Sequence, residues 1–287
     1  MTSRGLVIAA LCLVLLSCAP PAGAADPQGP AGKSSSESSS PSERFPPAWE
    51  AALKTTGDDA LYLLTAPLRL TWEKALIVGA IGAGIGVISL RDREIKGEIG
   101  HQRGSSLGDA ASAVSLLGYA PVLFGLNVGG IVVGEGIREA SGDRNLLDTA
   151  LLAAEAQLIT LAFSEGIAFA TARPGPRESD DPFRLKLGRS SFPSSHTSQA
   201  FAVAAVFSDR YDQPIPAIAY GLAGLVGVSR LIQEKHWASD VAAGAVLGWA
   251  IGKALSLRHS KPGAYLDFYP FVDPQQKSYG LIIEKRF

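Results

Sequence analysis

The chain has 287 residues, of which 47% are hydrophobic and 18% charged, and its formal net charge is −1. This length is enough for one sizeable hydrophobic core, and the near-neutral charge gives no reason to expect a nucleic-acid partner. The two cysteines, Cys12 and Cys18, both lie near the N-terminus, which excludes a disulfide and a thiolate metal site from the body of the chain.

Residues 1–24 are expected to be an export signal. Arg4 supplies a positive start, and Gly5–Leu16 is an apolar run shorter than the roughly 20 residues that a membrane-spanning helix needs. Two cleavage sites are compatible with this signal. The small residues Ala22-Gly23-Ala24 are typical of an ordinary signal-peptidase site, whereas Leu15-Leu16-Ser17-Cys18 resembles a bacterial lipoprotein box, in which Cys18 would be lipidated. A third alternative is an uncleaved membrane anchor.

Residues 25–58 are expected to be a linker. The stretch up to residue 47 is rich in Pro, Ser and Gly and includes two runs of three serines. Such a composition cannot bury enough apolar surface to order itself, so it predicts a flexible tether. Helical character begins at about residue 48, and the segment from Pro47 to Leu64 is expected to lie along a surface or a membrane face.

Residues 59–257 are predicted to form an all-α domain, a bundle of six helices. The prediction rests on six apolar segments, at about 73–90, 110–134, 146–171, 197–208, 215–231 and 237–256. We expect this bundle to be embedded in a membrane, although several segments are shorter than a span and a globular bundle is the alternative. Glu155 and Glu165 lie inside the third segment, where a carboxylate has to face the bundle interior or water.

Residues 258–287 differ in pattern from the helical part. Apolar and polar residues alternate over Tyr265–Val272 and again over Ser278–Phe287, on either side of Asp273-Pro274-Gln275-Gln276. This alternation around a turn-forming sequence predicts a small C-terminal β-hairpin.

The most informative stretch for function lies between the last two apolar segments. It contains Ser229-Arg230, then His236 after five residues and Asp240 after three more. The four-residue step places His236 and Asp240 on one helix face, where the carboxylate can accept a proton from one imidazole nitrogen and leave the other as a nucleophile or base. Arg230 is a permanent cation that can bind an oxyanion through two donors. Without partners, such a His–Asp pair is equally a helix cap or a surface contact.

Two upstream stretches supply possible partners. Pro193-Ser194-Ser195-His196 comes directly before the apolar run 200–207, so its backbone N–H groups are expected at a helix N-terminus, a natural anion site. Arg173-Pro174 and Arg177 precede it and add further cations.

Together the three stretches resemble the signature of the type 2 phosphatidic acid phosphatase superfamily, which also includes bacterial acid phosphatases and vanadium haloperoxidases. The pattern is Lys-x6-Arg-Pro, then Pro-Ser-Gly-His, then Ser-Arg-x5-His-x3-Asp. The third part matches at every specified position, and in the second part Ser195 replaces Gly. In the first part the Lys position is Gly166, or Ala168 in an alternative alignment that also places Gly175 at a second Arg position. The resemblance covers roughly residues 75–257.

The resemblance implies a phosphatase that uses no metal and no cofactor. His236 would be the nucleophile and form a phosphohistidine, Asp240 would orient it, and His196 would protonate the leaving group and then activate water. The phosphoryl oxygens would be held by Arg230, Arg173, Ser194 and Ser195, the last through its backbone N–H. Arg177 is the candidate to compensate for the missing lysine, and Arg184, Lys186 and Arg189 lie in the same loop.

The expected substrate is a lipid phosphate or diphosphate, and the expected location is a bacterial cell envelope, in the membrane or the periplasm. The alternatives are a family member that binds phosphate or lipid headgroups without turnover, a soluble periplasmic acid phosphatase for small phosphoesters, a vanadate-dependent haloperoxidase, and a structural helical bundle. An exported N-terminus and an odd number of crossings would place the motifs inside, whereas the superfamily's bacterial members usually work outside the cytoplasm, so the orientation stays open. The sequence predicts no oligomeric state.

Overall fold

The computed structural model describes residues 48–184, 190–259, 265–273 and 278–286. All of them belong to one of two compact units of the chain, Pro46–Phe287. The expected export signal with Cys18, the linker up to residue 47, and two of the loop cations, Lys186 and Arg189, lie outside the described residues.

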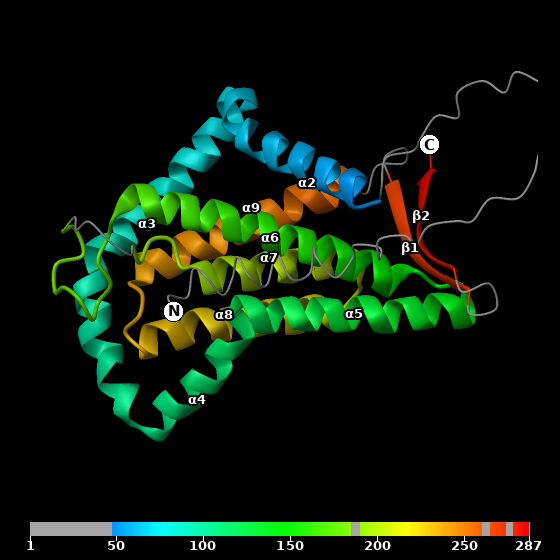
Figure 1. The fold of residues 1–287 in the computed structure, drawn as a ribbon. Coiled ribbons are helices and arrows are strands. Elements are labelled where there is room, and N and C mark those ends of the chain that lie inside the picture. Colours follow the sequence, from blue (N-terminus) through cyan, green and yellow to red (C-terminus); the bar gives the residue numbers. More distant parts are fainter. Residues whose placement is uncertain (1–47, 185–189, 260–264, 274–277, 287) are drawn as a thin grey trace, which may run out of the picture. The chain divides into compact units, whose positions relative to one another are not determined.

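Figure 1 shows the arrangement of the helices and strands along the chain. In order, the α-helices and strands are α2 (Ala48–Leu64), α3 (Trp72–Ile99), α4 (Ser106–Ser115), α5 (Ala120–Ser141), α6 (Asn145–Thr171), α7 (Ser195–Arg210), α8 (Ile215–Ile232), α9 (Ala238–His259), β1 (Tyr265–Asp273) and β2 (Ser278–Arg286).

The described residues therefore contain eight α-helices, where the apolar segments led us to expect six. The segment 110–134 is divided into α4 and α5 by the short 3₁₀ turn Leu116–Gly118, and Pro121 occupies the first turn of α5, where its missing N–H does no harm. The additional helix is α2, which contains the expected boundary at residue 59 between linker and helical domain. At the other boundary, α9 continues two residues beyond 257.

The helix ends follow local sequence signals. The hydroxyl of Thr71 accepts a hydrogen bond from the Lys74 N–H at the start of α3. Gly142, with φ 78°, ends α5 in the left-handed conformation that glycine adopts at low cost.

The helix α7 lies in the middle of the bundle and packs against α6, α8 and α9. Four of its eight buried residues are alanines, so neighbouring backbones approach it closely. On α9, a Cβ added at Gly248 would lie 1.8 Å from the Ser198 carbonyl oxygen. This close contact holds the first turn of α7 against the middle of α9, and the hydrogen bond from the Ser194 N–H to the Asp240 carbonyl oxygen joins the starts of the two helices.

The main hydrophobic cluster joins α6, α7 and α9. Its buried members are Leu152, Ala153, Ala156, Ile159, Ala202, Val206, Ile251 and Leu255. Ala60 and Leu63 of α2 pack against this cluster, so the C-terminal part of α2 is packed on the bundle.

Five helical segments are long and apolar enough to cross a membrane, by length and composition. They are Trp72–Gln102, Ala120–Ser141, Asn145–Thr171, Ile215–Ile232 and Ala238–His259. The apolar side chains of α3 are mostly exposed, among them Leu76, Val87 and Leu90. Exposed apolar surface of this extent marks an interaction site, here with lipid, and supports a membrane location. Glu155 faces the interior and Glu165 is exposed, six residues before the end of α6.

The C-terminal strands pair antiparallel, from Tyr265 opposite Arg286 to Asp273 opposite Ser278. Residues 274–277, the turn of the expected hairpin, lie outside the described residues, so the complete hairpin stays a prediction.

Candidate functional site

The three motifs meet at one end of the helical bundle. Arg173 follows the C-terminal end of α6, Ser194 and His196 lie at the start of α7, and His236 lies between α8 and α9 (Figure 1). Backbone hydrogen bonds join the segments. The Ser191 N–H donates to the Arg173 carbonyl oxygen over 2.7 Å. The side chains of Arg173 and Asp240, 67 positions apart in the sequence, are also hydrogen-bonded, so the fold brings the first and third motifs together.

Trp237 reinforces this junction. Its indole Nε1–H donates to the carbonyl oxygen of Pro174 over 2.9 Å, and the side chain is buried. A buried indole keeps its donor paired, so this bond locks the first motif onto the third.

The Arg173 guanidinium lies between two buried carboxylates. Nη1 donates to Asp240 Oδ1 and, over 2.8 Å, to Ser239 Oγ, while Nη2 donates to Asp92 Oδ2 over 2.7 Å. Nε donates to the Pro182 carbonyl oxygen over 2.7 Å. These bonds use four of the five N–H groups of the side chain and leave at most one for a ligand. Arg173 thus holds Asp240 in place, and its predicted contact with phosphate stays a proposal.

Asp92 of α3 is a component of the site that the sequence did not reveal. It is 1% exposed, and its Oδ1 accepts the Ser239 backbone N–H over 2.9 Å while its Oδ2 accepts the Ser239 hydroxyl over 2.5 Å. With the bond from Arg173, one carboxylate connects α3, the first motif and the start of α9. Asp92 is one of five charged residues between Arg91 and Lys96. The sequence of this run does not indicate which of its side chains is buried.

His236 and Asp240 are close together, but they do not form the expected hydrogen bond. Nδ1 of His236 lies 3.9 Å from Asp240 Oδ2, beyond hydrogen-bonding distance, and 2.7 Å from the Ser191 carbonyl oxygen. A carbonyl oxygen only accepts, so Nδ1 carries the proton and the lone pair of the neutral ring lies on Nε2. From the sequence, we expected the Asp240 carboxylate to accept the proton of one ring nitrogen. In the structure the acceptor is the Ser191 carbonyl oxygen, and the other ring nitrogen again keeps its lone pair.

Asp240 itself is fully buried at the start of α9. Its Oδ2 accepts the Trp237 N–H over 2.9 Å, and its backbone carbonyl accepts the Ser194 N–H over 3.0 Å. The carboxylate therefore caps the helix and orders the loop that carries His236.

The N-terminal turn of α7 holds the second motif. Ser194 is fully buried and its hydroxyl accepts a hydrogen bond from Thr197 over 3.0 Å, while Ser195 and His196 are half-buried. The ring of His196 lies 6.1 Å from that of Tyr119, centroid to centroid. The backbone N–H groups of a first helical turn have no partner within the helix, so this turn can bind an anion.

The remaining predicted cations differ in their positions. Arg230 is buried, 4% exposed, in the last turn of α8. Arg177 donates from Nη2 to the Gln233 carbonyl oxygen and thereby links the first motif to the end of α8. Arg184 is exposed.

Lys96 of α3 is a further cation that the sequence did not reveal. It lines a cleft together with His236, Asp92 and Trp237. Its Nζ donates to the Pro176 carbonyl oxygen over 2.7 Å and to Asp180 Oδ1 over 2.6 Å. The hydrogen bond and the charge of Lys96 hold the pKa of the Asp180 carboxyl below its usual value.

A second, larger hollow lies beside Arg173. It is a groove of about 430 Å³ whose lining includes Gly82, Ile85, Phe183 and Phe192, with Arg173 and Ser239 at its polar part. An apolar groove that reaches the charged cluster fits an amphiphilic ligand.

Among the described residues, one group of side chains is placed to hold a metal ion: Asp59, Glu155 and His259. These residues belong to α2, α6 and the C-terminal end of α9, away from the three motifs.

Comparison with known proteins gives one family match. Residues 149–263 match the model of the PAP2 superfamily. The lipid A 1-phosphatase of Porphyromonas gingivalis is 35% identical over 94 residues, 32% of this chain and 19% of that protein. An uncharacterised protein of Methanocaldococcus jannaschii is 38% identical over 76 residues, 26% of this chain and 31% of that protein. The chain therefore spans less than a third of each of these curated relatives.

Two solved structures align with part of the chain. One is the transmembrane PAP2 type phosphatidylglycerolphosphate phosphatase from Bacillus subtilis, with 20% identity and a TM-score of 0.45 over 63% of this chain and 94% of that chain. The other is LpxE of Aquifex aeolicus, with 24% identity and a TM-score of 0.42 over 57% of this chain and 93% of that chain.

Proposed function

We propose that the chain, whose residues 149–263 match the model of the PAP2 superfamily, is a membrane phosphatase that hydrolyses a lipid phosphate or diphosphate in a bacterial cell envelope. The observation that carries the proposal is the hydrogen bond between His236 Nδ1 and the Ser191 carbonyl oxygen. It prepares Nε2 of His236 as a nucleophile without a change of protonation.

The proposed reaction has two steps. In the first, Nε2 of His236 attacks phosphorus and the leaving oxygen takes a proton from His196, which gives a phosphohistidine. In the second, His196 accepts a proton from water as the water attacks phosphorus, and the nitrogen–phosphorus bond breaks. A positioned acid and base of this kind contributes about 10²–10⁴ in rate. The route uses protein groups and needs no metal.

The phosphoryl oxygens would be held by Arg230, by the backbone N–H groups of Ser195 and His196, and by the remaining donor of Arg173. The lysine of the family's first motif is missing here, since Gly166 or Ala168 stands at its position. We assign its task to Lys96, whose ammonium group is bound to the first-motif segment at Pro176 and lines the same cleft as His236. A cation placed there would stabilise charge that develops on the phosphoryl group.

A lipid substrate is favoured by the groove beside Arg173 and by the exposed apolar face of α3. Together they would let acyl or isoprenoid chains remain in the membrane while the phosphate reaches the charged cluster. The name of the Porphyromonas gingivalis relative, a lipid A 1-phosphatase, supports the same substrate class. A second candidate function, binding of a phosphate headgroup without turnover, is favoured by the missing lysine at position 166 or 168.

The proposal is tested by phosphate release from phosphatidic acid, an isoprenoid diphosphate and a small aryl phosphate, using purified protein in detergent. Activity should be lost in His236→Ala and kept in His101→Ala, since His101 is an exposed histidine outside the site. Preference for a lipid would give the substrate class, and preference for the aryl phosphate would favour a phosphatase for small phosphoesters. Wild-type release no greater than that of His236→Ala on every substrate would refute turnover.

A further inference from the structure

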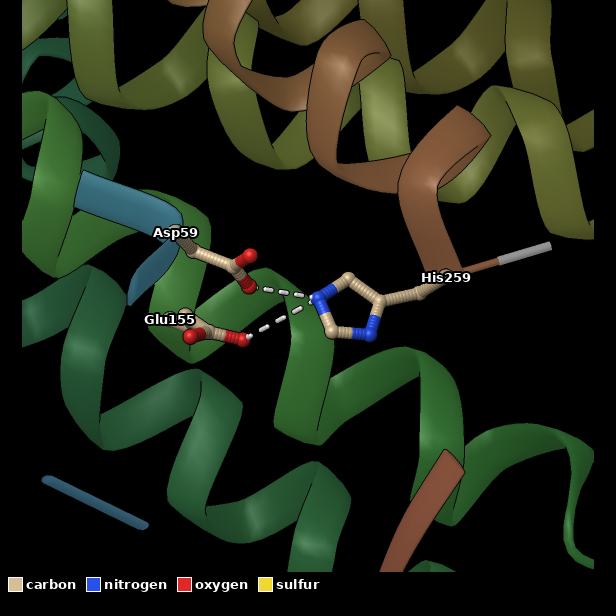
Figure 2. A group of neighbouring side chains, drawn as sticks. All are labelled: Asp59, Glu155 and His259. Atoms are coloured by element: carbon tan, nitrogen blue, oxygen red, sulfur yellow. Dashed lines mark hydrogen bonds and ion pairs between the residues drawn. The ribbon is translucent and has the colours of Figure 1, made fainter. Parts of the chain in front are cut away.

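A second cluster of ionisable groups lies at the end of α9 that is remote from the phosphate site. The helix has 22 residues, so at 1.5 Å per residue its last residue, His259, is roughly 30 Å from Asp240 near its start. Figure 2 shows the carboxylates of Asp59 and Glu155 directed at the imidazole of His259. The three side chains come from α2, α6 and α9, so tertiary packing rather than helical spacing brings them together.

The donor atoms are within coordinating range of one another. Nε2 of His259 lies 2.6 Å from Asp59 Oδ2 and 3.9 Å from Glu155 Oε2. One ligand atom from each residue can be chosen so that all lie within 4.8 Å of one another. The Asp59 side chain is 2% exposed, and those of His259 and Glu155 are 17% and 16% exposed. The cluster is thus largely shielded from water, and two of its three side chains keep a small exposed fraction.

Charge in this cluster is unbalanced when His259 is neutral. Two carboxylates face one cation, Arg258, whose Nε donates to Asp59 Oδ1. The other oxygen, Oδ2, lies 2.6 Å from Nε2 of His259. The Asp59 carboxylate is therefore oriented by Arg258 through one oxygen and faces the centre of the cluster with the other.

Glu155 provides the independent sign of a ligand. Thr56 hydrogen-bonds its carboxylate, yet Oε1 is buried and has no hydrogen-bond partner among the described residues. A buried carboxylate oxygen without a donor costs about 1–3 kcal/mol or more, so its place in the fold calls for a partner. A cation between the two carboxylates and the imidazole would supply that partner and balance the charge.

We propose that Asp59, Glu155 and His259 bind one divalent metal ion of the zinc class. One imidazole and two carboxylates are ligands that Zn²⁺ accepts, with a fourth position for water or for Glu155 Oε1. Tetrahedral coordination at 2.0–2.2 Å places donor atoms about 3.3 Å apart, and the two measured separations, 2.6 and 3.9 Å, lie on either side of this value. Arg258 then orients the Asp59 carboxylate from outside, as partners of metal ligands do. The proposal does not depend on the phosphatase function.

The ion would join α2 to α6 and α9 at this end of the bundle. The competing arrangement has no metal, with His259 protonated between the carboxylates. A proton and a metal ion compete for Nε2 of His259. The two arrangements can therefore be distinguished by whether the protein binds a metal ion at this nitrogen.

Metal binding is measured on the full chain in detergent, after removal of metals with a chelator, by calorimetric titration with Zn²⁺ and by metal analysis. We expect one zinc ion per chain, with affinity at least tenfold lower in His259→Gln and in Glu155→Gln. His101→Gln removes an exposed histidine, and His236→Ala removes one from the phosphate site. Both variants should bind zinc as the wild type does. Unchanged affinity in His259→Gln, or no zinc binding by the wild type, would overturn the proposal.

A second measurement on the wild-type chain covers the case in which a glutamine variant fails to fold. Co²⁺ bound in a tetrahedral nitrogen–oxygen site gives visible absorption bands, which Zn²⁺ should abolish in a one-to-one titration. The same bands should appear in His236→Ala, since the phosphate site is not involved. If the wild type showed no such bands, the arrangement with a protonated His259 would be correct.

Discussion

Replacing Asp92 with asparagine is expected to destabilise the protein and to disturb its site at the same time. The carboxylate accepts hydrogen bonds from Arg173 and from both the backbone N–H and the hydroxyl of Ser239, and its side chain is 0% exposed. Removing one partner of a buried ion pair costs about 3–5 kcal/mol, because the other charge is left uncompensated. Asparagine keeps one acceptor oxygen, so we expect a loss of about 3 kcal/mol in the free energy of unfolding, more than a hundredfold in the folding equilibrium.

The matched control is Glu94→Gln, the same change from carboxylate to amide on the same helix. Glu94 pairs with Arg91 three residues earlier, and both side chains are more than 60% exposed. Exposed pairs of this kind contribute about 0–1 kcal/mol, so this variant should unfold almost as the wild type does.

Stability is measured by denaturant titration in detergent, and phosphatase activity on the folded fraction of each variant. Asp92→Asn should also lower kcat, since Arg173 loses the group that holds it against Asp240. Equal stability of Asp92→Asn and Glu94→Gln would refute the assignment of a buried, structurally required charge to Asp92.

Three further predictions concern packing, charge and pH. Gly248→Ala should destabilise by about 1–3 kcal/mol because its Cβ overlaps the neighbouring backbone, whereas Gly86→Ala, with open space around it, should stabilise by about 0.5–1 kcal/mol in the same unfolding assay. Lys96→Met should lower kcat/KM about 10²–10³-fold, and Lys74→Met, an exposed lysine on the same helix, should not; equal rates would remove Lys96 from the site. The pKa of Asp59 is lower in the folded than in the unfolded protein, so its stabilising effect is complete above pH 3.8 and is lost as the pH falls through the lowered value. The free energy of unfolding of Asp59→Asn should therefore change less with pH in that range than that of the wild type, and an unchanged pH dependence would contradict this.

The third motif could be recognised from its spacing, and the structure does place His236 and Asp240 close together, with 3.9 Å between Nδ1 and Oδ2. The expected geometry was wrong, because α9 begins at Ala238 and His236 lies in the loop before it rather than on one helix face with Asp240. The partner of His236 could not be predicted, since the acceptor is the backbone carbonyl of Ser191, 45 positions away, and any residue type supplies a carbonyl.

The residues that were missed share one cause. Asp92 and Lys96 belong to a charged run in the C-terminal part of α3, and only the packing of α3 on α9 decides that Asp92 is buried and Lys96 lines the cleft. Glu155 shows the opposite case. A carboxylate inside an apolar segment is costly unless it faces the interior, and this argument placed it correctly, although it could not identify His259 as its neighbour.

The most direct test of the central proposal is to capture the phosphohistidine. The variant His196→Asn is mixed with a radiolabelled aryl phosphate, whose good leaving group needs no acid, so formation continues while hydrolysis of the intermediate slows. After quenching in alkali and digestion, mass spectrometry locates the phosphoryl group. We predict label on the peptide that contains His236, stable in alkali and lost in acid, and none when His236 is also changed to asparagine. Label on another residue, or substrate turnover by the double variant equal to that of His196→Asn, would contradict the assignment of His236 as the nucleophile.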